Sequence, residues 1–371
     1  MTLRIFKPFE TSGQSFQNVF VTAIMKVLSY EYTKKWCGVG SFTLTLPLTK
    51  RNVKTMQVGY IISVDGIAFS ADWLMIETVD YSGGILTVSG PDLNGILNLR
   101  RTLFGAAQAD GAQGYDIVEG STAHCIEHYL DNNIISPVDE ERMIPNFSFH
   151  TNDIVGISND SYMSRLELLS TVIEDLCNNA NIGYRIYGNS AAHDLIYFRL
   201  LMGVDRSVYQ TDRGKMVLAK GKGNVINYEF SHSVSDLYNA IYATGADVTM
   251  AVYRDSVKPS GFARRETAID VGAVSVSEIR QYALYEMRDN VESHCFDMDI
   301  RAGLYGEKFS LGDTITVYDT YSSNFFSAVV TEVRKTISNN QHSIKIVLGK
   351  QNQKLLNRIV TGIYTGSIKK R

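Results

Sequence analysis

The residues of this sequence that most suggest chemistry are two histidines and a glutamate in one short segment. His124, Glu127 and His128 match the pattern H-x-x-E-H, the inverted signature of zinc peptidases. On a helix, His124 and His128 lie four residues apart on one face, so both imidazoles could reach one Zn²⁺. Glu127 beside them would act as general base for a metal-bound water. A zinc metallopeptidase is therefore one hypothesis for this chain.

A zinc peptidase also needs a third protein ligand and a cleft that admits a peptide. Glu174 and Asp175, on the next expected helix, are candidates for that ligand. An adjacent acidic pair on an amphipathic helix is, however, typical of its solvent-exposed face. The sequence therefore favours His124 and His128 as exposed or partner-packed side chains, with no metal and no cofactor, over a zinc centre.

A second pair of acidic residues, Asp297 and Asp299, alternates with Phe296, Met298 and Ile300. On a strand both carboxylates lie on one face, roughly 7 Å apart, which would suit an inverting glycosidase. The same alternation is typical of a strand with one solvated face, and a third interpretation is that the pair lines a channel. No Ser-His-Asp or Cys-His set can be assembled from spacing, so the sequence favours a non-enzymatic protein.

Composition limits the remaining function classes. A chain of 371 residues with 44% hydrophobic and 20% charged residues is expected to fold into two or three domains. A formal net charge of -3 provides no general attraction to nucleic acid. The 21 tyrosines suit contact surfaces and leave a carbohydrate-binding adhesion module as an alternative. Four widely spaced cysteines are expected to be reduced and buried, namely Cys37, Cys125, Cys177 and Cys295.

The sequence predicts no stable membrane insertion. The most apolar early stretch, residues 19–28, is short and contains Lys26. The first residues also lack the apolar run and small-residue cleavage site of a signal peptide, so we expect synthesis in a cytoplasm.

The first hundred residues have the pattern of an antiparallel β region. Phe42, Leu44 and Leu46 alternate with threonines, as in a half-buried strand, and Pro47 ends the run. Further strands are expected at residues 58–64, 73–79 and 85–89.

Helices are expected in the middle of the chain, after a Gly- and Ala-rich loop at residues 105–114. Ser121 or Thr122 would cap a helix that runs to about residue 132. Ser164 and Glu167 fit a capping box and predict that a second helix begins there. Its core-facing residues would be Leu166, Leu169, Val172, Ile173, Leu176 and Ala180. Strands are expected to follow at residues 182–187 and 195–200.

The last third of the chain returns to strand patterns. The expected strands are residues 225–230, 240–244, 294–300, 314–317, 328–336 and 343–348. A helix is expected to open at Ser275, with Ile279, Tyr282, Ala283 and Met287 on one face.

The two ends of the chain repeat one pattern. The segment 59–64 leads through residues 76–79 to a strand ending at Gly90, with Leu97-Asn98 following. The segment 312–317 leads through residues 330–333 to a strand ending at Gly349, with Leu356-Asn357 following at the same offset. Such self-similarity predicts one small β-domain used twice.

Several of these stretches together resemble siphophage tail hub proteins of the tail-associated or baseplate-hub type. In the first half they are the segment 40–47 and the segment 86–93 with Ile96-Leu97 and Arg100-Arg101. In the second half they are Gly223 to Ile226, Tyr238 to Ala240, Arg264 to Glu266, Leu311 to Asp313 and Leu348-Gly349. The resemblance covers the chain to about residue 357 and rests on structural turns and strands.

The resemblance implies an α+β, mostly antiparallel β protein. Two tail-tube-like β-barrel domains, residues 1–100 and 221–357, would flank a smaller α+β insertion, residues 101–220, with a flexible C-terminal tail at residues 358–371. Three copies would form a ring that caps the tail tube, since a trimer matches six-fold tube symmetry when each chain presents two barrels.

The same resemblance implies the partners. They would be a homotrimer, distal tail and tail-tube proteins, tail-tip or receptor-binding proteins, and double-stranded DNA as transient cargo of the ejection channel. Asp297 and Asp299 would be channel-lining residues that repel phosphate. The protein would be made in the host cytoplasm and reside at the tail tip of the virion.

Overall fold

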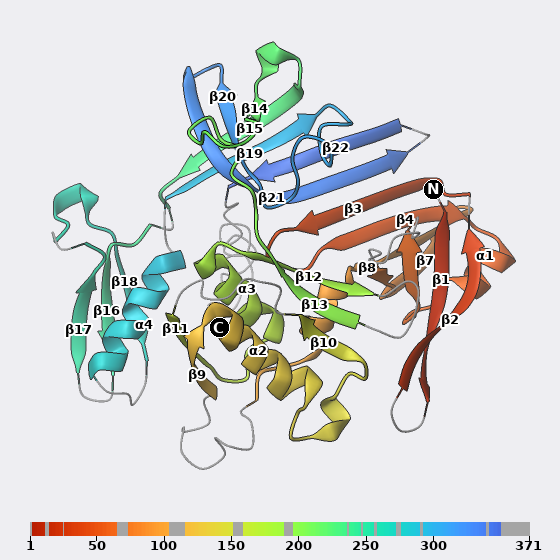
Figure 1. Ribbon diagram of the computed structural model, residues 1–371, viewed down its shortest axis with the longest axis horizontal. Helices are drawn as coiled ribbons and strands as arrows, with labels where there is room; N and C mark the ends of the chain where they lie inside the picture. Colours follow the sequence, from red (N-terminus) through yellow and green to blue (C-terminus); the bar gives the residue numbers. More distant parts are fainter. Residues whose placement is uncertain are drawn as a thin grey trace, which may run out of the picture. The chain divides into compact units, whose positions relative to one another are not determined.

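The computed structural model describes residues 2–11, 15–24, 26–64, 73–103, 116–150, 159–188, 196–235, 237–245, 248–255, 258–271, 276–289, 292–338 and 341–349. The chain forms two compact units (Figure 1). Unit 1 contains Met1–Tyr228 and Met298–Leu348, and unit 2 contains Glu229–Asp297 and Gly349–Arg371. The expected loop at residues 105–114 and the expected tail at residues 358–371 lie outside the described residues. Within those ranges, no helix is long and apolar enough to cross a bilayer.

The first hundred residues are strand-rich, as predicted. The strands are β1 (Leu3–Thr11), β2 (Ser15–Ile24), β3 (Ser29–Lys35), β4 (Ser41–Pro47), β5 (Ile61–Val64), β6 (Trp73–Met75), β7 (Thr78–Ser82) and β8 (Ile85–Pro91). Helix α1 (Lys50–Thr55) and the 3₁₀ helix η1 (Leu93–Leu99) complete this part. The strands pair in two antiparallel sets, β2-β1-β5-β6 and β3-β4-β8-β7.

Strand β4 shows why these residues form a sheet. Phe42, Leu44 and Leu46 are buried, while the intervening residues are exposed or half-buried, so the predicted alternation is confirmed. Their side chains join a core that includes Tyr30 and Tyr32 from β3. Burying one face of β4 fixes its register, because a slip by one residue would expose all three apolar side chains.

The middle of the chain mixes helices with short strands. Its elements are β9 (Asp116–Ser121), α2 (Thr122–Leu130), the π-helical turn η3 (Asp131–Ile135), η4 (Glu140–Arg142), β10 (Phe147–His150), β11 (Asn159–Ser164), α3 (Leu169–Ala180), β12 (Gly183–Gly188) and β13 (Ile196–Leu201). The Ser121 hydroxyl accepts a hydrogen bond from His124 N at 3.3 Å and caps α2, as predicted. Strand β13 pairs parallel to β10 and antiparallel to β12.

Helix α3 begins later than the sequence predicts. Ser164 ends strand β11, and Leu166 adopts a left-handed backbone (φ 55°) with its side chain 54% exposed. The predicted capping box is therefore wrong, although the Ser164 hydroxyl donates to Glu167 at 2.7 Å. From Leu169 onward the expected core face is present, because Leu169, Val172, Ile173 and Leu176 are buried.

The C-terminal part of unit 1 is again strand-rich. It contains β14 (Val217–Leu218), η5 (Lys220–Lys222), β20 (Thr314–Asp319), β21 (Asn324–Ser338) and β22 (Gln341–Leu348). Strand β15 (Val225–Ser233) carries the chain into unit 2, and β19 (Ser293–Ile300) carries it back.

Unit 2 is a small α+β unit. Its strands β16 (Ala240–Thr244), β17 (Thr249–Tyr253) and β18 (Glu266–Asp270) form a sheet in the order β17-β16-β18, with η6 (Gly261–Ala263) before β18. Helix α4 (Val276–Asp289) lies beside this sheet (Figure 1). As predicted, Ile279, Ala283 and Met287 face the core, where they join Ile241, Ala243 and Val252. The predicted opening at Ser275 and the side chain of Tyr282 lie outside the described residues.

The largest sheet contains the same strand order twice. Its order is β15-β19-β22-β21-β3-β4-β8-β7, with β14 and β20 attached beside β21. The N-terminal half contains β3, β4, β7 and β8. Along the sheet they lie in the order β3-β4-β8-β7, so the last two are exchanged relative to their order in the chain. In the C-terminal half β15-β19-β22-β21 follow the same order. The halves meet where β21 pairs antiparallel with β3, and these strands lie side by side in Figure 1.

The two halves also share their register. Strand β5 pairs with β6 as Ile61↔Met75, Ile62↔Leu74 and Ser63↔Trp73. Strand β20 pairs with β21 as Thr314↔Val329, Ile315↔Ala328 and Thr316↔Ser327, at the offsets that relate the two sequence segments.

The glycines that begin the two matching sequence segments also make equivalent backbone hydrogen bonds. Gly59 N donates to Ile76 O at 2.8 Å, and Gly312 N donates to Val330 O at 2.9 Å. Both glycines have positive φ, 84° and 91°. The two segments that match in sequence therefore share strand order, register and turn geometry, while Leu356-Asn357 lie outside the described residues and one β-domain used twice stays a prediction.

The fold is mostly antiparallel β with few helices, as predicted. Within the described residues, the strand pairings do not close into a barrel. The two-barrel arrangement and the domain boundaries at residues 100, 220 and 357 stay predictions. The four cysteines are free; Cys125, Cys177 and Cys295 are buried and Cys37 is half-buried.

Candidate functional site

The H-x-x-E-H residues lie on helix α2, but they do not converge on one point. His124 and Glu127 are exposed. His128 turns toward the start of β9, where its Nε2 lies 2.7 Å from Oδ1 of the buried Asp116 and 3.1 Å from Nδ2 of Asn132. The Nε2 atom of His128 is therefore engaged in a polar contact that joins α2 to β9.

Glu174 and Asp175, the candidates for a third zinc ligand, make contacts with other residues. Asp175 accepts a hydrogen bond from the Tyr162 hydroxyl at 3.2 Å. Burial raises the pKa of Glu174, and this effect is only partly offset by Lys35 and by the backbone N–H of Val39. Glu174 is thus a half-buried carboxyl rather than part of the solvated face that its sequence position suggests. Among described residues, no three metal-ligand atoms group around His124 and His128.

Asp297 and Asp299 alternate with buried residues on β19. Both acids are half-buried, whereas Phe296, Met298 and Ile300 are buried. Lys345 on β22 lies 3.8 Å from Asp299, which partly neutralises that carboxylate. The strand therefore has the two-faced character that the sequence predicts, and the role of its polar face stays a prediction.

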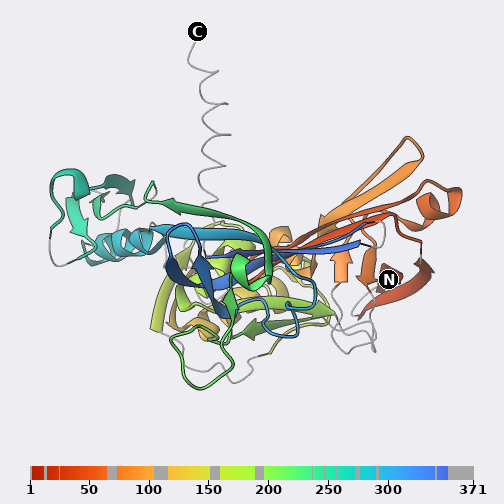
Figure 2. The ribbon, with the colours of Figure 1, turned by 90° about the horizontal axis from the view of Figure 1, so that it is seen from above.

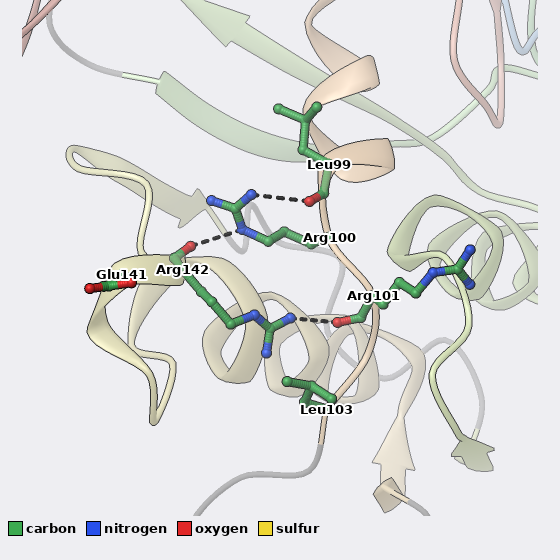
Figure 3. Close-up of a pocket in the computed structure, with 6 residues that line it drawn as sticks. All are labelled: Leu99, Arg100, Arg101, Leu103, Glu141 and Arg142. Atoms are coloured by element: carbon green, nitrogen blue, oxygen red, sulfur yellow. Dashed lines mark hydrogen bonds between the residues drawn. The ribbon is translucent and has the colours of Figure 1, made fainter.

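A cluster of arginines surrounds a surface pocket of about 280 Å³ in unit 1. Arg100 and Arg101 follow η1, and Arg142 ends η4; Figure 3 shows all three with Leu99, Leu103 and Glu141 at the pocket wall. Arg100 Nε donates to the carbonyl of Arg142 at 2.9 Å. Arg142 Nη2 donates to the carbonyl of Arg101 at 2.5 Å in return.

These reciprocal hydrogen bonds fasten η4 to the segment that links the N-terminal strands to the middle of the chain. Arg142 Nη2 also donates to Asn133 Oδ1 at 3.1 Å, and Arg101 Nη1 donates to Leu166 O at 2.8 Å. Burial, together with the nearby Arg100, lowers the pKa of Arg142. The guanidinium groups in Figure 3 donate to main-chain carbonyls. The arginine cluster therefore stabilises the contact between η4 and the segment after η1.

The two outer strands of the largest sheet form a different kind of candidate site. Strand β7 is mostly exposed, with Tyr81 at 64%, and Figure 2 shows the β7–β8 hairpin in orange extending outward. Strand β15, at the other end of the strand order, is also largely exposed, with Ile226 at 64%. Outer strands of this kind present backbone groups that can pair with another chain.

The two halves of the largest sheet meet where β21 pairs with β3, and we call this pairing the inner joint. It shows how the two halves contact each other within one chain. Strand β21 pairs with β3 over seven residues, from Glu332↔Lys35 to Ser338↔Ser29. Across the joint, Arg334 Nε lies 3.6 Å from Glu31 and 3.4 Å from the Thr33 hydroxyl. Sequence reasoning missed β3, although the alternation Tyr30, Tyr32 with intervening polar residues was a usable signal.

Family comparison identifies the class of this chain. The chain belongs to the family described as Siphovirus ReqiPepy6 Gp37-like protein, whose model matches residues 18–255. No curated protein sequence gives a significant match.

Solved structures give the fold. A 43 kDa tail protein of prophage MuSo2 from Shewanella oneidensis is 10% identical, with 93% of this chain and 95% of that chain covered and a TM-score of 0.54. A tail protein from Neisseria meningitidis MC58 is 11% identical, with coverages of 94% and 97% and a TM-score of 0.54. Prophage tail protein gp18 from Listeria monocytogenes EGD-e is 10% identical, with coverages of 97% and 98% and a TM-score of 0.52.

The fold of this chain is thus that of phage tail proteins along nearly its whole length. Family and fold together confirm the resemblance to siphophage tail hub proteins of the tail-associated or baseplate type. The chain is thus a member of this siphovirus protein family and has the fold of phage tail proteins.

Proposed function

We propose that three copies of this protein form a ring that caps the tail tube, connects it to the tail tip and contributes to the DNA ejection channel. The observation that carries this proposal is the repeated strand order within one chain, with its matched register in β5–β6 and β20–β21. Three chains with two repeats each would present six similar units, which is what a trimer needs in order to continue a six-fold tube.

The inner joint supplies a template for the contacts between subunits. Within the chain, β21, at one end of the C-terminal half of the sheet, pairs with β3, at one end of the N-terminal half. At the opposite ends of these halves lie β7 and β15, the two outer strands of the sheet. We infer that β7 of one subunit pairs with β15 of the next, so that similar joints alternate within and between chains.

The outer strands have the properties that such pairing needs. Neither β7 nor β15 contains proline, which would remove a backbone donor. Both expose apolar side chains, Tyr81 on β7 and Ile226 on β15, that assembly would cover. Natural monomers usually protect long exposed outer strands, so strands left open in one chain favour partners in an assembly.

The ring would be a component of the virion with double-stranded DNA as transient cargo. Asp297 remains a candidate for the channel wall because a half-buried carboxylate repels phosphate. Asp299 is the weaker candidate, since Lys345 lies 3.8 Å away. Distal tail, tail-tube and tail-tip proteins would be the neighbours above and below the ring.

This function is structural and requires no catalysis. The zinc-peptidase alternative is not favoured, since His128 contacts Asp116 and the described residues group no three ligand atoms at α2. The carbohydrate-binding alternative rests on tyrosine content alone.

The test is the oligomeric state of chains altered on an outer strand. Ile226→Lys places a charge on β15 at a side chain that is already exposed in the single chain, so we expect intact folding but a reduced trimer fraction. Val138→Lys is the matched control, because Val138 is 67% exposed and lies on neither outer strand. Native mass spectrometry at several concentrations would give the trimer fraction, and electron microscopy would locate the protein in tails.

A wild-type chain that stays monomeric at high concentration and is missing from the tail tip would overturn the proposal. Equal trimer fractions for Ile226→Lys and Val138→Lys would overturn the β7–β15 joint.

A further inference from the structure

Unit 2 contains a group of metal-ligand side chains that the sequence analysis did not single out. His232 lies near the end of β15, His294 lies on the neighbouring strand β19, and Glu292 directly precedes β19. One ligand atom from each residue lies within 4.8 Å of the others. Among described residues, this is the group in which three histidine, cysteine or carboxylate ligands converge.

The three ligand atoms lie close enough together for small side-chain movements to place them around one ion. His232 Nε2 contacts Glu292 Oε1 directly, and His294 Nε2 lies 4.0 Å from the same oxygen. Tetrahedral zinc with ligand distances of about 2.0–2.1 Å places its ligand atoms roughly 3.4 Å apart. An ion between them requires His294 to approach Glu292 by roughly 0.6 Å, His232 and Glu292 to move apart, and the nearly parallel imidazole rings to rotate.

Ring stacking holds the two histidine side chains together. The rings of His232 and His294 are stacked, with centroids 4.3 Å apart and planes 12° from parallel. Phe230 stacks on His294 at 6.2 Å and on Phe296 at 4.6 Å, so a row of aromatic rings supports one imidazole. The three ligand side chains are 40 to 48% exposed, so an ion can reach them from solvent.

The donor set indicates the kind of ion. Two imidazole nitrogens and one carboxylate oxygen form a common zinc ligand set, whereas magnesium and calcium prefer oxygen ligands. Three protein ligands leave one position of a tetrahedral ion for water or another group.

We propose that His232, Glu292 and His294 form a surface site for a divalent transition metal, with Zn²⁺ as the expected ion. The site is separate from the H-x-x-E-H segment on α2. Its three ligands come from one chain, so zinc binding can be tested on the single chain, whereas the ring is tested by the oligomeric state; His232 lies on β15, the strand that we infer to pair with the next subunit.

Zinc titration of the full chain tests the site. Metal-free protein is dialysed against micromolar ZnCl₂, and bound zinc is measured by inductively coupled plasma mass spectrometry. We expect about one zinc per wild-type chain and at least a tenfold weaker affinity for the double variant His232→Ala/His294→Ala. Glu292→Gln preserves side-chain shape and removes the charge, so it should weaken binding while the chain stays folded.

Two controls separate this site from other histidines. His342→Ala removes an exposed histidine on β22, and His124→Ala removes the exposed histidine of the H-x-x-E-H segment. Both should keep wild-type zinc uptake, and circular dichroism should show native spectra for every variant. No zinc on the wild-type chain, or equal uptake by His232→Ala/His294→Ala, would overturn the proposal.

Discussion

Gly312 lies directly against the indole of Trp36. A Cβ atom on Gly312 would come within 2.3 Å of a Trp36 ring carbon, and the glycine has φ +91°. Gly59 occupies the equivalent position of the N-terminal repeat with φ +84°, yet a Cβ there would meet nothing within 4 Å. The repeat therefore uses the same turn twice, with tight packing at only one of the two copies.

This pair allows backbone strain to be separated from packing. Gly59→Ala should lower the free energy of unfolding by about 1–2 kcal/mol, the cost of a left-handed backbone for a residue with a Cβ. Gly312→Ala should lose about 1–3 kcal/mol more, because the added methyl group overpacks Trp36. Urea unfolding of both variants measures the difference. Equal losses would show that Trp36 can move aside.

Glu174 gives a prediction for the dependence of stability on pH. Burial raises the pKa of this carboxyl in the folded chain. Because the folded value lies above the unfolded value of about 4.3, ionisation opposes folding as the pH rises through that range. Glu174→Gln should therefore stabilise the protein relative to wild type at pH 7 and lose this advantage toward pH 4.

Unfolding midpoints at pH 4, 5.5 and 7 check the Glu174 prediction. Glu140→Gln, which changes an exposed glutamate on η4, is the control and should show little pH-dependent difference from wild type. A Glu174→Gln variant that is less stable than wild type at pH 7 would mean that the Lys35 contact outweighs the burial.

Asp319 gives the opposite dependence. Hydrogen bonds from Ser322 and from Tyr228, whose hydroxyl lies 2.5 Å from Asp319 Oδ1, lower the pKa of Asp319 to about 2. The unfolded value is about 3.9, so the carboxylate stabilises the fold above about pH 4, and this contribution is lost as the pH falls toward 2. Asp319→Asn should thus be less stable than wild type at pH 7, with a smaller difference at pH 3.

Chemical denaturation at pH 7, 5 and 3 measures the Asp319 effect. Asp255→Asn, at an exposed aspartate of unit 2, serves as the comparison. A constant difference between Asp319→Asn and wild type across this range would exclude the ionised carboxylate as its cause.

His128 and His124 should behave differently when each is replaced by alanine. His128→Ala leaves the buried Asp116 carboxylate without its imidazole contact and should cost about 1–3 kcal/mol. His124→Ala removes an exposed side chain and should change stability by no more than about 0.5 kcal/mol. Thermal unfolding with and without EDTA measures both, and the loss in His128→Ala should not depend on the chelator.

Local sequence patterns predicted the strands and helices that bury one face of their own side chains. The alternation in β4 and the apolar positions of α3 after Leu169 were sufficient, because each element buries its own stripe of side chains. The likeness of the two segments that begin at Gly59 and Gly312 was also visible, since the same glycine turn and strand pairing need similar residues in both places.

Contacts between distant segments could not be read from local patterns. Ser164 and Glu167 do form a hydrogen bond, but Ser164 is taken into β11 by pairing with Asp116 on β9, so the helix begins later. The three metal-ligand residues were missed for a similar reason, because His232 and Glu292 meet only when β15 and β19 become neighbours.

The β21–β3 joint has a consequence for how the protein is made. Thr33 and Arg334, which meet across it, are 301 residues apart in the chain. At a synthesis rate of about 5–20 residues per second, the β3 segment waits roughly 15 to 60 s on the ribosome before its partner emerges. The pairing of β3 with β21 can form only after β21 has left the ribosome, so the nascent chain must be kept from aggregating through that interval.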